Sequence, residues 1–312
     1  MTLTQLRYLV QVASTGHFHK AAKACHVTQP TLSAQLGLLE RQLGVTLLDR
    51  SRHPVVPTPL GSRVVAQARI VLEEHARIHE LVGISRGVVQ GSYRLGIIPT
   101  VASSLIPLFF EPFRSAHPGV ELEILELTTA QIIEGLRSDD LDGGIAATPL
   151  EDATLEENPL YYEDFHIYSC RPPHRGGHGK VSPSDIDPSS LLLLKDGHCF
   201  RDQVLRLCKG PRTGTRGIRY EGGNFQTLMK LVDSGCGTTL IPQLTALALS
   251  ASQRRRHVHD FKDPVPRREI SLVTHRLAKV VISQAIATVI RSSLPPGISR
   301  EKPGKVLPPL PR

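Results

Sequence analysis

Residues 92–147 constrain the fold most, because short apolar stretches of strand type alternate there with stretches of helical periodicity. The predicted order is strand, helix, strand, helix, strand, at 93–98, 101–116, 120–127, 130–138 and 141–147. This alternation is typical of an open α/β sheet, which binds ligands at the carboxyl ends of its strands. Thr100 and Thr129 lie just after two of the predicted strands. A second α/β subdomain is expected to begin within 165–195.

The N-terminal residues predict three helices, at 2–14, at 18–25 and from Thr28 to Gly44. Thr28 is a good N-cap, and a proline is tolerated in the first turn of the helix that follows it. Two short helices, a tight turn and a third helix that begins with amide and hydroxyl side chains form a helix-turn-helix pattern. Such side chains hydrogen-bond base edges or phosphates. The residues expected to contact DNA here are Gln29, Pro30, Thr31, Ser33 and Gln35.

Positive charge is concentrated around this pattern. Residues 1–58 hold six Lys and Arg against two acidic residues, so this segment carries four of the chain's eight net positive charges. The stretch 47–52 has the character of a wing, in which Arg50 and Arg52 suit phosphate contacts. The expected partner is therefore double-stranded operator DNA.

A long helix is predicted from Thr58-Pro59 to about Arg86. Its apolar residues recur at alternating spacings of four and three, a pattern that predicts packing against a partner helix. The residues of this seam are Val64, Ala68, Val71, His75, Ile78 and Val82.

Cys199 and Cys208, two of the five cysteines, lie nine positions apart in a segment of roughly helical spacing. Positive charge stabilises a thiolate, and His198 and Arg201 flank the first cysteine, whereas the second lies among leucines. One reactive and one unreactive sulfur suit a redox sensor. A helix would separate them by about 13 Å, so a disulfide would require the segment to unwind. The alternative is that both are ordinary buried cysteines.

Several classes of protein are disfavoured. The sequence has neither a long apolar span nor a signal-peptide pattern, so we expect a cytoplasmic protein away from the membrane. No C-x-x-C pair occurs, and the His-Val-His run at 257–259, like His174 and His178, lacks further ligands at useful spacing. We therefore expect no metal and no cofactor. Six prolines and mixed charge predict a disordered tail over 294–312.

Residues 1–60 resemble the DNA-binding domain of LysR-type transcriptional regulators. The motifs that carry this resemblance are Ala21-Ala22, Gln29-Pro30-Thr31-Leu32-Ser33, Leu39-Glu40, Leu43-Gly44 and Thr58-Pro59-x-Gly61. Later segments, at 225–232 and 234–242, resemble the effector domain of the same family.

The resemblance implies an α + α/β fold in four parts. These are a winged helix-turn-helix over 1–58, a linker helix and hinge over 59–90, an effector domain of two α/β subdomains like a periplasmic binding protein over 91–293, and the tail. It also implies a homodimer or homotetramer joined by the linker helix, an activator's contact with RNA polymerase, and no enzymatic activity.

A narrower resemblance is to the peroxide-sensing members of that family. Its motifs are Gly197-His198-Cys199-x-Arg201-Asp202-Gln203 with Cys208, Ile98-Pro99-Thr100, and Glu126-x-x-Thr129-x-Gln131. It implies that Cys199 reacts with hydrogen peroxide, that Cys208 closes a reversible disulfide, and that oxidative-stress genes are controlled. The implied peroxide pocket consists of Thr100, Thr129, His198, Arg201, Asp202 and Gln203. The chain departs from the pattern at Gly222-Gly223-Asn224 and at Arg219.

Two other functions remain open at the level of sequence. A LysR-type regulator of a small metabolite would place Thr100 on its ligand and leave Cys199 incidental. A thiol peroxidase would need Cys199 but has no use for a helix-turn-helix. Cys25, Cys170 and Cys236 are interpreted as structural.

Overall fold

The computed structural model describes residues 1–85, 89–171, 180–208, 224–275, 279–302 and 306–308, apart from the side chains at 73, 76, 77 and 79–85. Arg219, Gly222-Gly223, and the histidines at 174 and 178 lie outside these residues, as does the side chain of Val82. The chain divides into two compact units, 1–87 and 88–312. In the described part, no helix is long and apolar enough to cross a membrane.

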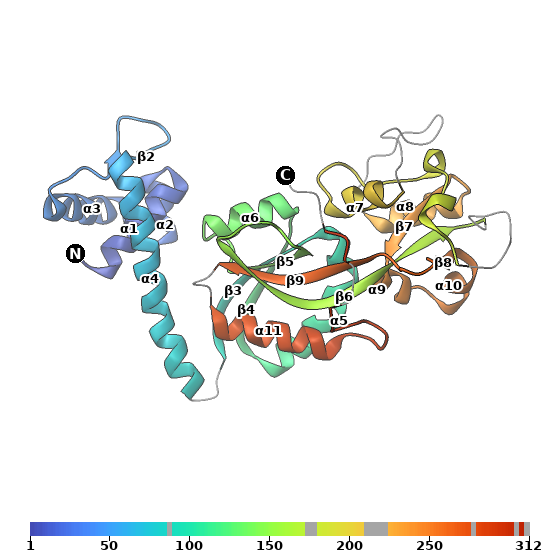
Figure 1. The fold of residues 1–312 in the computed structure, drawn as a ribbon. Helices are drawn as coiled ribbons and strands as arrows, with labels where there is room; N and C mark the ends of the chain where they lie inside the picture. Colours follow the sequence, from blue (N-terminus) through green and yellow to red (C-terminus); the bar gives the residue numbers. More distant parts are fainter. Residues whose placement is uncertain (86–88, 172–179, 209–223, 276–278, 303–305, 309–312) are drawn as a thin grey trace. The chain divides into compact units, whose positions relative to one another are not determined.

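The first unit contains the predicted helix-turn-helix and wing (Figure 1). Its elements are α1 (Leu3–Thr15), α2 (Phe18–Ala24), α3 (Gln29–Leu43), β1 (Leu48–Asp49), β2 (Val56–Pro57) and α4 (Pro59–Ser85).

Local sequence sets the helix boundaries. Thr2 forms a capping box at the start of α1, and the Thr28 hydroxyl caps α3. Gly16 and Gly44 end these two helices in the left-handed conformation, which glycine adopts without steric cost. The apolar stripe of α3 packs into the core as predicted, except that Leu43, the last residue of the helix, is 40% exposed.

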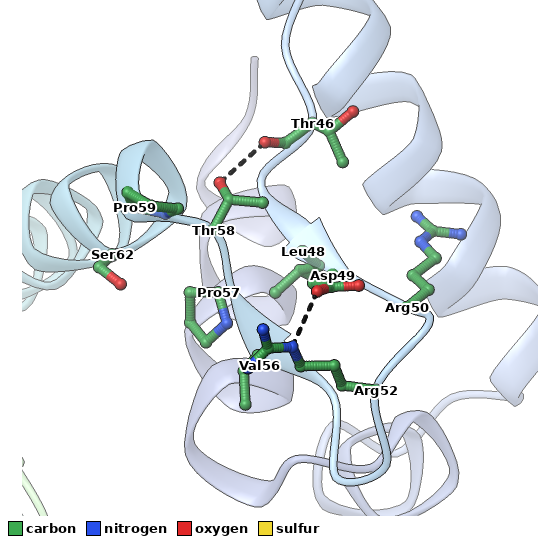
Figure 2. A pocket seen from close by; sticks show the side chains of 10 residues that line it. All are labelled: Thr46, Leu48, Asp49, Arg50, Arg52, Val56, Pro57, Thr58, Pro59 and Ser62. Atoms are coloured by element: carbon green, nitrogen blue, oxygen red, sulfur yellow. Dashed lines mark hydrogen bonds and ion pairs between the residues drawn. The ribbon is translucent and has the colours of Figure 1, made fainter.

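Gly61 lies where α4 passes closest to the wing. A Cβ at this position would come within 1.9 Å of the Leu47 carbonyl oxygen, so a larger residue does not fit. The Thr58 hydroxyl accepts a hydrogen bond from the Gly61 N–H at 2.9 Å and donates to the Thr46 carbonyl at 3.0 Å (Figure 2). These contacts explain the Thr-Pro-x-Gly pattern, because they fix the direction in which α4 leaves the wing.

The predicted seam of α4 has two parts. Ala68 is buried and Val64 partly buried against the core of the first unit. Farther along the same stripe, Val71 is 37% and Ile78 is 60% exposed. The second part therefore forms an apolar surface that extends beyond the core of its own domain.

The second unit is built on one mixed sheet (Figure 1). Its strands are β3 (Gln90–Ile97), β4 (Gly119–Glu126), β5 (Gly143–Thr148), β6 (Leu155–Ser169), β7 (Thr238–Pro242), β8 (Val258–Asp260) and β9 (Arg267–His275). Its helices are α5 (Pro99–Ala116), α6 (Thr129–Arg137), α7 (Cys199–Cys208), α8 (Phe225–Asp233), α9 (Gln243–Leu247), α10 (Ala251–His257) and α11 (Val280–Ser293), with short 3-10 turns at Pro183–Asp185 and Pro188–Ser190. The sequence predicted the elements between 92 and 147 to within a few residues.

The strand order is β4-β3-β5-β9-β6-β7, with β8 also paired to β6. The pairs of β3 with β4 and with β5 are parallel, and the other pairs are antiparallel. Helices α5 and α11 pack together on one face of the sheet, and α6 lies on the other (Figure 1).

Two hydrophobic cores divide this unit into subdomains. The first lies around β3, β4 and β5 and includes Phe109 and Ile145. The second lies around β7, α7 and α8 and includes Val204. Strand β6 runs through both cores, with Tyr161 in the first and Phe165 in the second. The α + α/β fold with two α/β subdomains is confirmed.

The structure differs from the predicted disorder after residue 293. Ile298 is buried against the first core, and the Ser299 carbonyl accepts a hydrogen bond from the Tyr162 N–H of β6 at 2.8 Å. Farther along, the Leu307 N–H donates to the Arg267 carbonyl at 2.7 Å. A few apolar and backbone contacts thus hold a segment whose proline content had predicted disorder.

Replacement of Val71 by Asp tests the exposed half of the seam. A buried charge opposes helix pairing, so the variant is expected to sediment as a monomer and to bind a full operator about tenfold or more weakly, because bivalent binding is lost. Ala66→Asp is the matched control, since Ala66 is an exposed position on the opposite face of α4. If both variants keep the native oligomer, the seam does not join subunits.

Candidate functional site

Helix α7 begins at Cys199 and ends at Cys208, and both thiols are free. Cys199 packs into the first core, whereas Cys208 packs with Val204 into the second. The helical rise separates the two Cα atoms by about 13 Å, and a disulfide requires less than about 7 Å. The expected helix is therefore present and holds the two sulfurs apart. The structure adds that each sulfur lies in the core of a different subdomain.

Cys199 is only 5% exposed, and burial raises the pKa of its thiol. The Arg268 guanidinium and the Thr129 hydroxyl oppose this by lowering the pKa, and the Asp202 carboxylate raises it. A buried thiol beside a buried cation is protonated at rest, and the cation stabilises its thiolate when the proton leaves.

The expectation that Arg201 activates Cys199 is not supported by its contacts. The Arg201 guanidinium pairs with Asp196 at 2.7 Å and donates to the Leu194 carbonyl at 2.8 Å. Residues two apart on a helix point in different directions, so Arg201 serves the turn before α7. His198, the residue before the first cysteine, is buried.

Arg268 is the cation that sequence reasoning missed. It is fully buried and pairs with Glu163 at 2.7 Å, so β9 and β6 supply the two halves of an ion pair. Its guanidinium donates to the Thr100 hydroxyl and carbonyl, both at 3.2 Å, and lies over the Phe200 ring at 5.1 Å. The only signal in the sequence was an arginine at the start of the predicted strand 268–274, in which apolar and polar residues are mixed.

Of the predicted pocket residues, Thr100 is buried beside this cation and Thr129 beside the thiol, and Gln203 is completely buried. Gln203 lies one helical turn after Cys199, and its amide nitrogen donates to the Leu307 carbonyl at 2.8 Å. In this region, Thr129 Oγ1, Tyr161 Oη and Gln203 Oε1 are buried and make no hydrogen bond to a nitrogen or oxygen of the described residues. Buried polar atoms are normally satisfied, so this region could hold a small polar molecule.

Cys208 has a different environment. Burial raises the pKa of its thiol to about 12, and no charged group among the described residues acts on it. The prediction of an unreactive second thiol agrees with these surroundings.

The helix-turn-helix presents Gln29, Pro30 and Thr31 at its exposed face. Thr31 also shares a hydroxyl hydrogen bond with the capping Thr28 at 2.8 Å. Ser33 is half-buried and its position continues this face. Gln35, also half-buried, accepts a hydrogen bond from Gln5 at 3.1 Å, so its side chain is tied to α1.

The two wing arginines, Arg50 and Arg52, differ in how firmly ion pairs hold their side chains. Arg50 pairs with Glu40 at 2.8 Å, and the same carboxylate accepts from the Leu47 and Leu48 N–H groups, which anchors the wing to α3. Arg52 is 71% exposed and pairs with Asp49 at 3.2 Å (Figure 2). Such an exposed pair is weak, so Arg52 can exchange Asp49 for a phosphate at little cost.

Replacement of Arg268 by Met tests its role directly. The unpaired Glu163 carboxylate is expected to cost about 3–5 kcal/mol of stability in urea unfolding, and the pKa of Cys199 is expected to rise in a titration of thiolate absorbance. Arg267→Met is the matched control, because Arg267 pairs with the partly exposed Asp164 and the loss is expected to be below about 1 kcal/mol. If the two variants lose equal amounts of unfolding free energy, the buried pair contributes no more to stability than the exposed one.

Comparison with known proteins places this geometry in a family. The profile of the bacterial regulatory helix-turn-helix proteins of the lysR family matches residues 3–62, and that of the LysR substrate binding domain matches residues 86–291. A probable hydrogen peroxide-inducible genes activator from Streptomyces viridosporus is 33% identical over 94% of both chains.

Solved structures agree with this assignment. A full-length OxyR variant from Pseudomonas aeruginosa is similar with a TM-score of 0.75 and 33% identity, covering 93% of this chain and 98% of that one. A hydrogen peroxide-bound OxyR mutant from Corynebacterium glutamicum is similar with a TM-score of 0.61 and 30% identity, covering 94% and 92%. The chain belongs to the LysR family of transcriptional regulators and, within it, to the hydrogen peroxide-inducible gene activators of the OxyR type.

Proposed function

We propose that this peroxide-responsive regulator is switched by a reversible disulfide between Cys199 and Cys208. The observation that carries the proposal is the placement of the two thiols at the ends of one helix and in two different cores. Within the described part of the chain, the first thiol has a cation and a hydroxyl beside it and the second has neither.

The proposed chemistry proceeds in two steps. The Cys199 thiolate attacks one oxygen of hydrogen peroxide, so that an S–O bond forms, the O–O bond breaks and the leaving oxygen departs as water after protonation. The Cys208 thiol then displaces a second water from the sulfenic acid, which closes the disulfide. Thr129, Gln203 and the Thr100–Arg268 pair would hold the peroxide and stabilise the leaving oxygen. His198 and Asp202 flank the reacting thiol in this proposal.

Closure of the disulfide requires α7 to unwind, because its two ends stand about 13 Å apart as a helix. Cys199 would leave the first core, and the aromatic stack of Phe200 with Phe165, at 5.0 Å, would be disturbed. Since an effector shifts an equilibrium only through a free-energy difference between two states, this loss of packing is the proposed source of the conformational change.

We further propose that α3 reads operator bases through Gln29, Pro30, Thr31, Ser33 and Gln35, with Arg50 and Arg52 at the phosphates. The exposed seam of α4 would pair two subunits in a homodimer or homotetramer. An activator that binds promoters also contacts RNA polymerase, and free thiols of this kind persist in a reducing cytoplasm. The oxidation is stoichiometric, so the protein acts as a sensor, not as an enzyme.

Substitution of each cysteine tests the switch. Cys199→Ser is expected to abolish the change in DNA footprint that peroxide causes. Cys208→Ser is expected to form a sulfenic acid, detectable with a dimedone-type probe, but no lasting switched state. Mass spectrometry of the oxidised wild type is expected to give a Cys199–Cys208 peptide.

The controls are Cys25→Ser, Cys170→Ser and Cys236→Ser, which are expected to respond to peroxide almost normally. If Cys199→Ser protein still changes its footprint with peroxide, the disulfide proposal is wrong. A response of that variant to a small metabolite instead would identify a ligand-controlled regulator.

Base reading is tested by Gln29→Ala. Loss of a bidentate base contact is expected to cost about 1–3 kcal/mol of discrimination against other sequences while leaving non-specific binding nearly unchanged. Gln42→Ala is the control, because Gln42 is an exposed glutamine at the other end of α3. An equal loss on operator and random DNA would mean that Gln29 does not read bases.

A further inference from the structure

Three side chains with metal-binding atoms meet in the second subdomain. None of them belongs to α7 or takes part in the proposed disulfide switch. Cys170 follows the end of β6, Asp233 is the last residue of α8, and His257 is the last residue of α10. The sulfur, a carboxylate oxygen and a ring nitrogen of these residues all lie within 4.8 Å of one another. The sequence did not indicate this cluster, because its members are separated by 63 and 24 positions.

The hydrogen bonds of the cluster leave these atoms available. Among the described residues, the Asp233 carboxylate accepts a hydrogen bond only from the Tyr168 hydroxyl, at 2.8 Å and through Oδ1. The His257 Nδ1 atom is buried and makes no hydrogen bond in the described part of the protein. Buried imidazole nitrogens are normally satisfied, so this atom is set up to receive a ligand.

Neighbouring groups fix the orientation of the three side chains. The His257 ring packs against the Tyr168 ring with centroids 5.5 Å apart. The Tyr168 hydroxyl orients the Asp233 carboxylate, as groups outside the metal's own ligands do in metal sites. The Cys170 thiol donates to the Val232 carbonyl at 3.1 Å. Burial and Asp233 raise the pKa of Cys170, so the thiol is protonated until a cation displaces that proton.

We propose that Cys170, Asp233 and His257 form a binding site for a divalent cation of the zinc class. One thiolate, one imidazole and one carboxylate are a borderline-soft ligand set that suits Zn²⁺ and Co²⁺ rather than Mg²⁺ or Ca²⁺. Ligand atoms around a tetrahedral zinc lie roughly 3.3–3.8 Å apart, as its bond lengths require, so small side-chain rotations complete the geometry. Three protein ligands leave the fourth position for water, and the Cys170 proton is released to solvent on binding.

Such an ion would join β6, α8 and α10, which are otherwise held together by the second core and the sheet. Because Asp233 is exposed, the ion can enter from solvent without any opening of the fold. Binding would therefore stabilise the second subdomain in its folded form.

The experiment uses the full-length protein, chelator-treated and kept reduced, titrated with Co²⁺ and then with Zn²⁺ against a chromogenic competitor. One ion per chain is expected, with a thiolate-to-Co²⁺ charge-transfer band that Zn²⁺ removes, and Zn²⁺ is expected to raise the melting temperature by several degrees. Cys170→Ser is expected to lose the band and His257→Gln to weaken binding about 100-fold or more.

Cys236→Ser is the matched control. Cys236 is also half-buried and lines a cavity of about 390 Å³ together with Cys170, yet it is not one of the three ligands. It is expected to bind Co²⁺ as the wild type does. Asp233→Asn, at an exposed position, tests the site if Cys170→Ser does not fold.

Absence of the charge-transfer band in folded wild-type protein would overturn the proposal, and so would unchanged binding in Asp233→Asn or Cys170→Ser. Neither outcome bears on the Cys199–Cys208 switch, whose peroxide response is measured separately.

Discussion

The ion pair between Arg268 and Glu163 is the interaction on which the rest of the effector unit depends. Both side chains are almost completely removed from water, and removal of a charge from water is favourable only if the partner and further hydrogen bonds replace the lost hydration. Glu163 also accepts from the Leu244 N–H at 3.1 Å, and Arg268 donates to Thr100. One pair therefore fixes strands β6 and β9 relative to α5 and α9.

The same pair sets the chemistry at α7. The guanidinium lies over Phe200 and lowers the pKa of the adjacent Cys199 thiol against the effect of burial. The packing of the strands and the pKa of this thiol thus both depend on Arg268, because it pairs with Glu163 and also lowers the pKa of Cys199. A change in α7 cannot leave the environment of Arg268 unaltered, which connects the state of the thiol to the sheet.

Features that depend on neighbouring residues in the chain, such as helix boundaries, could be predicted from the sequence. The cap at Thr28 and the glycine at Gly44 define α3 without help from the rest of the chain. The roughly helical spacing of residues around Cys199 and Cys208 likewise indicated a helix where α7 lies. Arg201 was chosen for its nearness in sequence, although a helix directs residues two apart to different sides. Arg268 lies 69 positions from Cys199, on a different element, and the antiparallel pairing of β9 with β6 places it opposite Glu163.

The region after α11 shows the same limit. Prolines and charges predicted disorder in this region. Amino-acid composition does not show which backbone groups will form hydrogen bonds, and a single carbonyl or N–H can anchor a segment to a strand. The contacts of Ile298, Ser299 and Leu307 depend on partners in β6, β9 and the first core. Such partners become neighbours only after the sheet has formed, so composition alone could not identify them.

The carboxyl end of the chain has a consequence for handling the protein. Leu307 accepts a hydrogen bond from Gln203 in α7 and donates one to Arg267 in β9. Leu307 therefore bridges the helix that carries both cysteines and the strand that carries the buried cation. Proteolytic trimming before Leu307 removes that bridge, and so does a purification tag that displaces this segment. Either change alters the reduced state from which the midpoint reduction potential of the two cysteines is measured.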